Sequence, residues 1–239
     1  MPALRFRSKM DSELIISNGV KILYEDNHLI VAVKPAGVLS QSDGSNAPDM
    51  LTILKAYIKD KYNKPGEVYL GLVHRLDRPV SGVMVFARTS KAASRLSEQI
   101  RTRKVDKIYR AVVQGIMKGS GYLDNYILKD ASSNTVTVHD REVPGSKHAV
   151  LDYKTVKTSD DRSLVEIKLG TGRSHQIRAQ FANSGHPLLG DRRYGDTALW
   201  DGDIALQAFR LEFDHPTKGD RMVFEISAPE CEPWVSIAP

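Results

Sequence analysis

The stretch from His148 to Leu169 reads HAVLDYKTVKTSDDRSLVEIKL and indicates what kind of sheet this chain builds. In its second half, Val165, Ile167 and Leu169 alternate with charged side chains, which is the two-residue period of a half-buried β-strand. Because the two halves follow one another directly, we expect a β-hairpin. Two strands joined by a short turn pair in the antiparallel direction.

Strands follow one another directly in other parts of the chain too. A second hairpin is expected at residues 122–138, and single strands at residues 21–24, 29–33, 83–87, 107–115, 203–213 and 221–227. Helices are expected at residues 49–62, after a cap at residue 89 or 90, and from about 174 to 183. Strands outnumber helices, so the sequence predicts an α+β fold: one domain on a mixed, mostly antiparallel β-sheet with flanking helices.

The length of 239 residues fits one domain, and the chain shows no repeat and no low-complexity linker. We expect an N-terminal tail over residues 1–19, frayed over its first 13 residues. The folded domain is expected over residues 20–230, in one lobe or two, followed by a C-terminal tail over residues 231–239. The polar segment 130–147 is the best candidate for a mobile loop.

Composition narrows the class of protein. The hydrophobic fraction of 41% and the charged fraction of 26% exclude wholesale disorder. The net charge of +5 favours a polyanionic partner without requiring one. The lone cysteine, Cys231, excludes an intrachain disulfide and fits a reducing compartment, so we expect a cytoplasmic protein. No apolar stretch approaches the roughly 18 residues that span a membrane, and we expect no membrane partner.

Asp77 is the first candidate for chemistry. It stands in HRLDRPVSG, residues 74–82, between two arginines and just before the apolar run at 83–87. Nearby cations favour the carboxylate form, and an ionised carboxylate can act as a nucleophile at a sugar carbon or as a base. The alternative is an ion-paired turn, since Asp-Arg-Pro followed by Gly is a common turn sequence.

The segment TGRSHQIR, residues 171–178, is the second candidate. Ser174 is expected to cap a helix, and Arg173 at its start makes a plausible anion site. His175 and Arg178 share a helix face, so Arg178 could reach back to a buried carboxylate. The alternatives are a solvated basic helix start and a structural, hydrogen-bonding His175.

The third candidate is KIYR, residues 107–110. Tyr109 points to the opposite face from Ile108 and is either a core or cross-strand residue or a platform on which a base stacks. The sequence contains no P-loop, no GxGxxG and no metal-ligand cluster, so we expect no metal and no nucleotide cofactor. Two functions remain: an enzyme without a cofactor that acts on a polyanion, and a binding module without chemistry.

Taken in order, these segments resemble the RluA-type RNA pseudouridine synthase family. The matching stretches are DNHLIV at 26–31, KPAG at 34–37, HRLD at 74–77 with Ser81-Gly82, KIY at 107–109, GRSHQIR at 172–178, GHPLLGD at 185–191 and FDHP at 213–216. Each is short, but their order is specific, and together they cover about residues 20–230.

The resemblance implies isomerisation of uridine to pseudouridine in RNA, with no cofactor and no metal. It implies that Asp77 carries the covalent chemistry, as nucleophile or as base. It also implies that Tyr109 stacks on the target base, that Arg178 pairs with Asp77, and that Arg75 enters the helical stack where the uridine leaves. Extrusion of the base is required because a base inside a helix cannot be reached.

By the same carry-over, His74, Lys107, Arg173 and His175 are expected to contact the substrate. The RNA is expected to be a stem-loop of tRNA or of large-subunit rRNA, bound by a monomer. Many relatives carry a small RNA-binding domain ahead of the catalytic one, and we expect no such separate N-terminal domain here. Recognition would then rest on the catalytic domain itself.

The chain departs from the family pattern at three positions, which bear on substrate choice. Val80 stands where the family often has Thr, and Gln180 and Gln207 stand where it often has His. Two other functions fit part of this pattern. An RNA-binding pseudo-enzyme or chaperone would be favoured by loss of a catalytic residue, and a glycosidic-bond hydrolase typically needs a second carboxylate, which no matched motif supplies.

Overall fold

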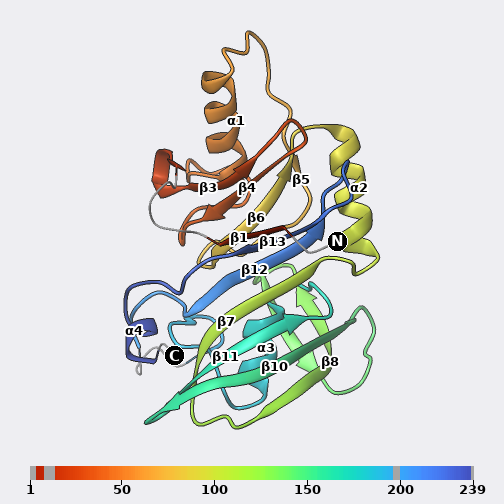
Figure 1. Ribbon diagram of the computed structural model, residues 1–239. Coiled ribbons are helices and arrows are strands. Elements are labelled where there is room, and N and C mark those ends of the chain that lie inside the picture. Colours follow the sequence, from red (N-terminus) through yellow and green to blue (C-terminus); the bar gives the residue numbers. More distant parts are fainter. Residues whose placement is uncertain (1–3, 8–13, 196–199, 238–239) are drawn as a thin grey trace. The chain divides into compact units, whose positions relative to one another are not determined.

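The computed structural model describes residues 4–7, 14–195 and 200–237 and divides the chain into two compact units (Figure 1). Unit 1 consists of residues 1–107 and 208–227, and unit 2 of residues 108–207 and 228–239. The chain leaves unit 1 for unit 2 within strand β7 (Asp106–Gln114). It returns to unit 1 within strand β12 (Leu206–Asp214).

Unit 1 is a sheet with two helices. Its hydrogen-bonded strand order is β2 (Leu14–Ile15), β3 (Lys21–Glu25), β4 (Leu29–Lys34), β6 (Ser81–Ala87) and β12. In addition, β5 (Gly71–Leu72) pairs with β6, β13 (Arg221–Glu225) pairs with β12, and β1 (Leu4–Arg7) pairs with β13 in parallel. The one-turn 3-10 helix η1 spans Ser17–Gly19, and the α-helices are α1 (Met50–Lys61) and α2 (Ser90–Arg101).

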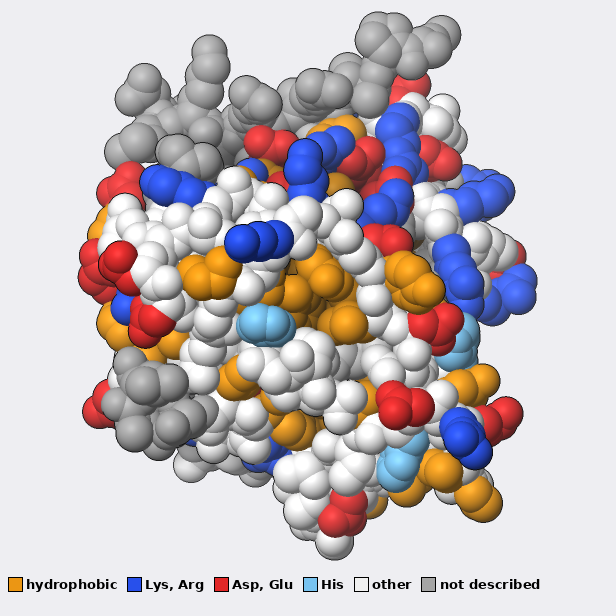
Figure 2. All heavy atoms as spheres, turned by 90° about the horizontal axis from the view of Figure 1, so that it is seen from below, with side chains coloured by type: hydrophobic (Ala, Val, Ile, Leu, Met, Phe, Trp, Pro, Cys, Tyr) orange, Lys and Arg blue, Asp and Glu red, His pale blue; other side chains and the backbone are white. Residues whose placement is uncertain are grey.

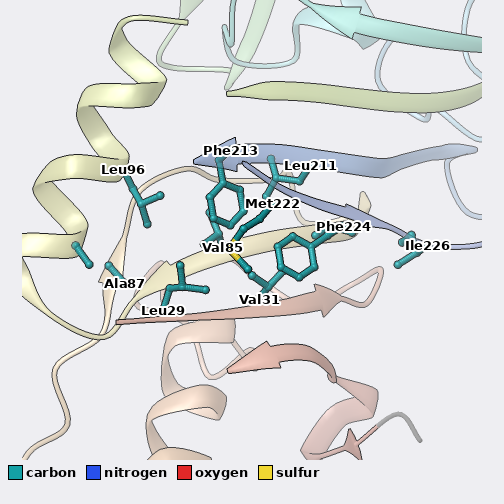
Figure 3. Close-up of a cluster of buried hydrophobic side chains, with 12 residues drawn as sticks. Leu29, Val31, Val85, Ala87, Leu96, Leu211, Phe213, Met222, Phe224 and Ile226 are labelled. Atoms are coloured by element: carbon teal, nitrogen blue, oxygen red, sulfur yellow. The ribbon is translucent and has the colours of Figure 1, made fainter. Parts of the chain in front are cut away.

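The core of unit 1 lies around β6, whose apolar run is buried. Figure 3 shows side chains of β4, β6, α2, β12 and β13 pointing toward one another; they include Leu29, Val31, Val85, Leu96, Phe213 and Phe224. Burying an aliphatic or aromatic side chain of this size stabilises the fold by about 1.5–3 kcal/mol. The start of β6 is fixed further by Gly82, which has a φ of +139° and where a Cβ would lie 2.4–2.6 Å from atoms of Ala208. The loop that precedes β6 is therefore attached to a strand whose first residues are rigidly held.

A second anchor in unit 1 joins two turns far apart in sequence. The Asp26 carboxylate accepts hydrogen bonds from the backbone N–H groups of His28 (2.8 Å) and Leu29 (3.0 Å), and His215 Nε2 lies 2.8 Å from its other oxygen. His215 Nδ1 accepts the N–H groups of Thr217 and Lys218 at 3.2 and 3.0 Å, so the ring proton sits on Nε2 and is donated to Asp26. The turn before β4 is thus tied to the turn after β12.

This anchor makes the free energy of unfolding depend on pH in the acid range. Burial raises the pKa of Asp26, but its hydrogen bonds outweigh burial and lower the pKa from 3.8 to about 2. A carboxyl group whose pKa is lower in the folded protein than in the unfolded chain stabilises the fold at any pH above the unfolded pKa. That stability is lost as the pH falls through the folded pKa. For Asp26 the loss is about 2 kcal/mol between pH 4 and pH 2. We expect Asp26→Asn to lower the free energy of unfolding by about that much at pH 7, as measured by urea titration. The gap should shrink toward pH 2, and a gap of constant size would contradict the assignment.

Unit 2 is an antiparallel sheet with one helix against it. The strand order is β7, β11 (Arg162–Leu169), β10 (Lys147–Ser159), β8 (Ser120–Asp130) and β9 (Thr135–His139). Helix α3 (Gln176–Asn183) packs on one face of this sheet. There the rings of Phe181 and Tyr153 meet edge-on, with their centroids 5.8 Å apart. The short helix α4 (Trp234–Ile237) buries Trp234 and Ile237 beside Val112 and Leu164.

The predicted fold class is confirmed, because both units contain mixed or antiparallel sheets with few helices. Three local expectations are wrong. Leu4–Arg7, expected to be frayed, gains a partner strand in β13; the expected loop at 130–147 contains β9, which pairs with β8; and part of the C-terminal tail is held by the buried Trp234. Backbone pairing and one large apolar side chain override polar local composition in these segments. Among the described residues, no helix is long and apolar enough to cross a membrane.

Candidate active site

Asp77 lies in the loop between β5 and β6, immediately before the strand end fixed by Gly82. Its carbonyl accepts a hydrogen bond from the N–H of Val80 at 3.1 Å, which closes a turn. The side chain is partly exposed, and the arginines on either side of it, Arg75 and Arg78, are exposed. Unit 1 therefore presents this carboxylate on a short turn at the start of a buried strand.

Lys34 is a buried cation close to this turn. It has no exposed surface, and its Nζ donates to the carbonyl oxygens of Pro35 (3.0 Å), Val38 (2.6 Å) and Arg78 (3.0 Å). Burial lowers the pKa of Lys34 to about 7, while the charge of Asp77 opposes that shift. Lys34 thus ties the end of β4 to the turn of Asp77, and its protonated form places a positive charge near that carboxylate.

His74 and Lys107 lie near one another inside unit 1. His74 Nε2 accepts the backbone N–H of Val85 at 3.1 Å. Burial lowers the pKa of His74 to about 3, and the charge of Lys107 acts in the same direction, so this imidazole is neutral at pH 7. Burial also lowers the pKa of Lys107. The His74 ring is thus engaged by the backbone of β6, and the expected contact of both residues with substrate stays a prediction.

Arg178 is held by a carboxylate in unit 2. It is 6% exposed, and its Nε and Nη2 donate to Oδ2 and Oδ1 of Asp191 at 2.8 and 2.7 Å. Oδ1 of Asp191 also accepts the N–H groups of Arg193 (3.0 Å) and Tyr194 (3.2 Å). Burial raises the pKa of Asp191, but the hydrogen bonds and charge of Arg178 outweigh it, so the net pKa is lowered. One ionised, buried carboxylate therefore fixes the plane of this guanidinium.

Tyr194 links Arg178 to the β8–β9 hairpin. The guanidinium carbon of Arg178 lies 5.3 Å from the centroid of the Tyr194 ring, a cation–π distance. The Tyr194 hydroxyl accepts the N–H of Val136 at 2.9 Å and lies 2.8 Å from His175 Nδ1. His175 is therefore a hydrogen-bonding residue of this network, and its expected contact with substrate stays a prediction.

The start of α3 differs from the prediction. The residue before the helix is His175, which has a left-handed backbone (φ +52°) and makes no side-chain cap, so the expected cap at Ser174 is wrong. The turn is instead organised by Gln176, whose Oε1 accepts the Arg173 N–H at 3.0 Å and the Thr171 hydroxyl at 2.8 Å. A non-glycine residue with this φ is uncommon and marks local strain beside the Arg178 network. The Arg173 side chain is exposed, and its Nε donates to the carbonyl of His148 at 2.9 Å.

Tyr109 is buried in β7 on the same side of the sheet as α3. It stands opposite Ile167 of β11, which in turn stands opposite Tyr153 of β10. Residues directly opposite one another in an antiparallel sheet point to the same face, and Tyr153 contacts α3 through Phe181. Unit 2 therefore brings Tyr109 to the sheet face that carries Arg178. Asp77 belongs to unit 1, and its meeting with these two residues stays a prediction.

Comparison with known proteins decides the family. The sequence profile described as RNA pseudouridylate synthase matches residues 28–183, which is more than half of the chain and includes Asp77, Tyr109 and Arg178. The chain belongs to the RNA pseudouridylate synthase family. The predicted RluA-type resemblance is thereby confirmed, and with it the enzyme class.

Relatives in this pseudouridylate synthase family cover most of the chain. An uncharacterized RNA pseudouridine synthase of Aquifex aeolicus is 37% identical over 224 residues, covering 88% of this chain and 70% of its own length. The ribosomal large subunit pseudouridine synthase D of Pseudomonas aeruginosa is 34% identical over 231 residues, covering 90% of this chain and 70% of its own. The solved structure of human RNA pseudouridylate synthase domain containing 4 has the same fold, with a TM-score of 0.73, 24% identity, and coverage of 87% of this chain and 88% of the human one.

The three departures from the synthase pattern are all buried. Val80 and Gln207 are 2% and 4% exposed, and Gln180 is 1% exposed. Gln180 Nε2 lies 3.3 and 3.1 Å from the carbonyls of Leu123 and Ala149, so this side chain attaches α3 to β8 and β10. The three departures therefore lie in the interior of the two units.

Surface charge in this family member is mixed. The chain has 34 Lys and Arg against 29 Asp and Glu. On the face drawn in Figure 2, Lys and Arg side chains lie among Asp and Glu side chains. On this face, therefore, charge alone does not mark an RNA-binding surface.

Sequence reasoning gave no role to three residues that support the candidate site. Lys34 and Asp191 lie inside the matched stretches KPAG and GHPLLGD, but nothing in their spacing shows that they are buried. Tyr194 lies outside every matched stretch. The available signal was a charged side chain inside an apolar context, which indicates a buried charge with a dedicated partner.

Proposed function

We propose that this protein converts specific uridines in structured RNA to pseudouridine, with Asp77 as nucleophile or base, with base flipping and with no cofactor. The observation that carries the proposal is the position of Asp77 in the HRLD stretch, on a turn held rigidly at the start of β6, in a chain of the RNA pseudouridylate synthase family. A carboxylate on a rigid strand end can be aimed at a sugar carbon.

The reaction is an isomerisation, which suits a site without a cofactor. The bond between C1′ of the ribose and N1 of uracil breaks, the base turns, and a bond forms between C1′ and C5. C5 loses a proton and N1 gains one, so no other reactant is consumed. Asp77 acts at C1′ as a nucleophile or takes the proton as a base.

Tyr109 and Arg178 complete the proposed catalytic set. Asp191 fixes the guanidinium of Arg178 through Nε and Nη2, and the family resemblance assigns this guanidinium to pair with Asp77. Tyr109 stacks on the extruded uracil, and Arg75, which is exposed, enters the helix where the base leaves. Extrusion costs a few kcal/mol, and stacking on an aromatic ring returns roughly 1–3 kcal/mol.

The substrate is tRNA, large-subunit rRNA, or both. The name of the Pseudomonas aeruginosa relative, a ribosomal large subunit pseudouridine synthase, supports the second. His74, Lys107, Arg173 and His175 are proposed to contact the RNA, directly or by holding the residues that do, in a monomeric enzyme of the cytoplasm.

The proposal is tested by mapping pseudouridine in total RNA with carbodiimide labelling and sequencing, in cells with and without the gene. A site that vanishes on deletion and returns with the wild-type gene establishes both the reaction and the RNA. If every site persists while the protein still crosslinks to RNA, the protein is an RNA-binding pseudo-enzyme. Release of free uracil from RNA would indicate a hydrolase.

Tyr109 gives a further prediction within this function. Tyr109→Phe keeps the ring, so we expect turnover within about threefold of wild type, whereas Tyr109→Ala removes the stack and should lower it by at least about tenfold. Single-turnover rates on the mapped RNA measure both, and thermal melting shows whether either variant is folded. Equal losses in the two folded variants would show that the hydroxyl is the important group.

A further inference from the structure

The turn that carries Asp77 is attached to one loop of unit 1, residues 34–40, here called the strap. The strap bonds the backbone on both sides of Asp77. On one side, the Ser40 hydroxyl donates to the carbonyl of Leu76 at 2.8 Å and accepts its N–H at 3.0 Å. On the other side, the N–H of Gly37 donates to the carbonyl of Arg78 at 2.9 Å, and Lys34 Nζ reaches the same oxygen.

Ser40 is the one strap side chain that satisfies both backbone groups of a single residue. Its side chain replaces the pair of bonds that a neighbouring strand would make, and Leu76 is the residue directly before Asp77. Ser40 and Leu76 are 5% and 7% exposed, so water does not readily replace these bonds.

The strap is itself anchored at the position of Ser40. The N–H of Leu39 donates to the carbonyl of Pro48 at 3.0 Å, and the carbonyl of Leu39 accepts the N–H of Met50 at 2.8 Å. Asp49 caps α1 by accepting the N–H of Thr52 at 3.1 Å. Ser40 therefore transmits the rigidity of the α1 end to the residue before Asp77.

We propose that Ser40 is a positioning residue for the reaction: its hydroxyl fixes the peptide before Asp77 and so sets the direction of the Asp77 carboxylate. The inference rests on the proposed function, because it concerns the reaction of Asp77. A small misplacement of a reacting group can lower a rate strongly, while leaving distant RNA contacts unchanged. Loss of the Ser40 hydroxyl should thus lower the chemical step and spare RNA binding.

The chain offers a matched control in unit 2. Ser163 has no exposed surface, and its hydroxyl accepts the N–H of Met117 at 2.8 Å and donates to the carbonyl of Gly115 at 2.8 Å. Ser163→Ala removes the same chemistry, a buried hydroxyl bonded to one backbone N–H and one backbone carbonyl, at a place with no bond to the Asp77 turn.

The experiment compares wild type, Ser40→Ala, Ser40→Thr and Ser163→Ala, each well below its melting temperature. Single-turnover rates and dissociation constants are measured on the RNA stem-loop found by pseudouridine mapping, and hydrogen–deuterium exchange is followed over residues 77–82. We expect Ser40→Ala to lower the rate at least about tenfold with the dissociation constant within about twofold. It should also speed exchange at Val80, while Ser40→Thr restores both quantities and Ser163→Ala changes neither.

A Ser40→Ala rate within about twofold of wild type overturns the inference, as does an equal loss in Ser163→Ala. A loss expressed in RNA affinity instead of rate overturns it too. If wild type forms no pseudouridine, the proposed function fails by itself. The hydrogen–deuterium exchange measurement then still tests whether Ser40 fixes the Asp77 turn. Unchanged exchange at Val80 in Ser40→Ala would show that Ser40 does not hold it.

Discussion

Asp77→Asn is expected to abolish pseudouridine formation while leaving the fold and the affinity for RNA nearly unchanged. The substitution keeps the size of the side chain but removes the negative charge and the nucleophilic oxygen that the proposed reaction needs. We expect the single-turnover rate to fall at least about thousandfold, which corresponds to about 4 kcal/mol in the activation barrier. Fold is checked by thermal melting and affinity by filter binding.

A neighbouring acid provides the control for that variant. Asp43 lies in an exposed loop, where the hydroxyl and N–H of Ser45 lower its pKa, with a smaller contribution from Arg78. Asp43→Asn changes the same charge close to the same arginine and should leave the rate within about twofold, because the group makes no bond to the turn. Residual activity of Asp77→Asn above a tenth of wild type would refute the role of Asp77.

The second large effect is expected at Asp191. Asp191→Asn preserves shape but replaces one acceptor oxygen by an N–H₂ group that faces the donors of Arg178. Removing one partner of a buried ion pair typically costs 3–5 kcal/mol of stability, and the guanidinium loses its fixed plane. We expect a rate loss of about hundredfold, mainly in kcat, because the guanidinium of Arg178, proposed to act in the reaction, can no longer be held in one orientation.

An exposed ion pair in the same unit separates charge from positioning. Arg192 and Asp201 pair at 3.2 Å with side chains 70% and 92% exposed. Asp201→Asn removes one charge from the surface and should change stability by no more than about 0.5 kcal/mol and the rate hardly at all. If Asp191→Asn behaved like Asp201→Asn in single-turnover and urea-unfolding measurements, the orienting role of Asp191 would be excluded.

The sequence predicted those helices and strands that are marked by a pattern of apolar and polar residues within their own length. The alternation in residues 165–169 and the apolar run at 83–87 mark strands that the structure contains, and Thr89 caps α2 as expected. The strand at Leu4–Arg7 could not be predicted, because its partner lies more than 200 residues away along the chain. Pairing with a distant strand leaves no periodic signal in a four-residue segment.

The candidate site could be predicted only in part for a similar reason. Asp77, Tyr109 and Arg178 were found through their ordered motifs, since each belongs to a short stretch that the family profile also matches. Ser40, which bonds the residue before Asp77, and Asp191, which bonds Arg178, are buried groups that also bond the backbone. Such bonds depend on tertiary structure, and a serine or an aspartate in a loop gives no sign of them in the sequence.

The division of unit 1 between residues 1–107 and 208–227 has a consequence for synthesis on the ribosome. Chains emerge N-terminus first at about 5–20 residues per second, and a core closes only when all of its parts are available. Leu211, Phe213, Met222 and Phe224 belong to the core around β6, so the first half of unit 1 must wait for the rest of the chain before that core can close. Most of unit 2 is one continuous segment, and all strands of its sheet have been synthesised before residues 208–227 of unit 1. The strands of unit 2 can therefore pair before the core behind the Asp77 turn closes, whereas Trp234 and Ile237, which complete the core of unit 2, are made last of all.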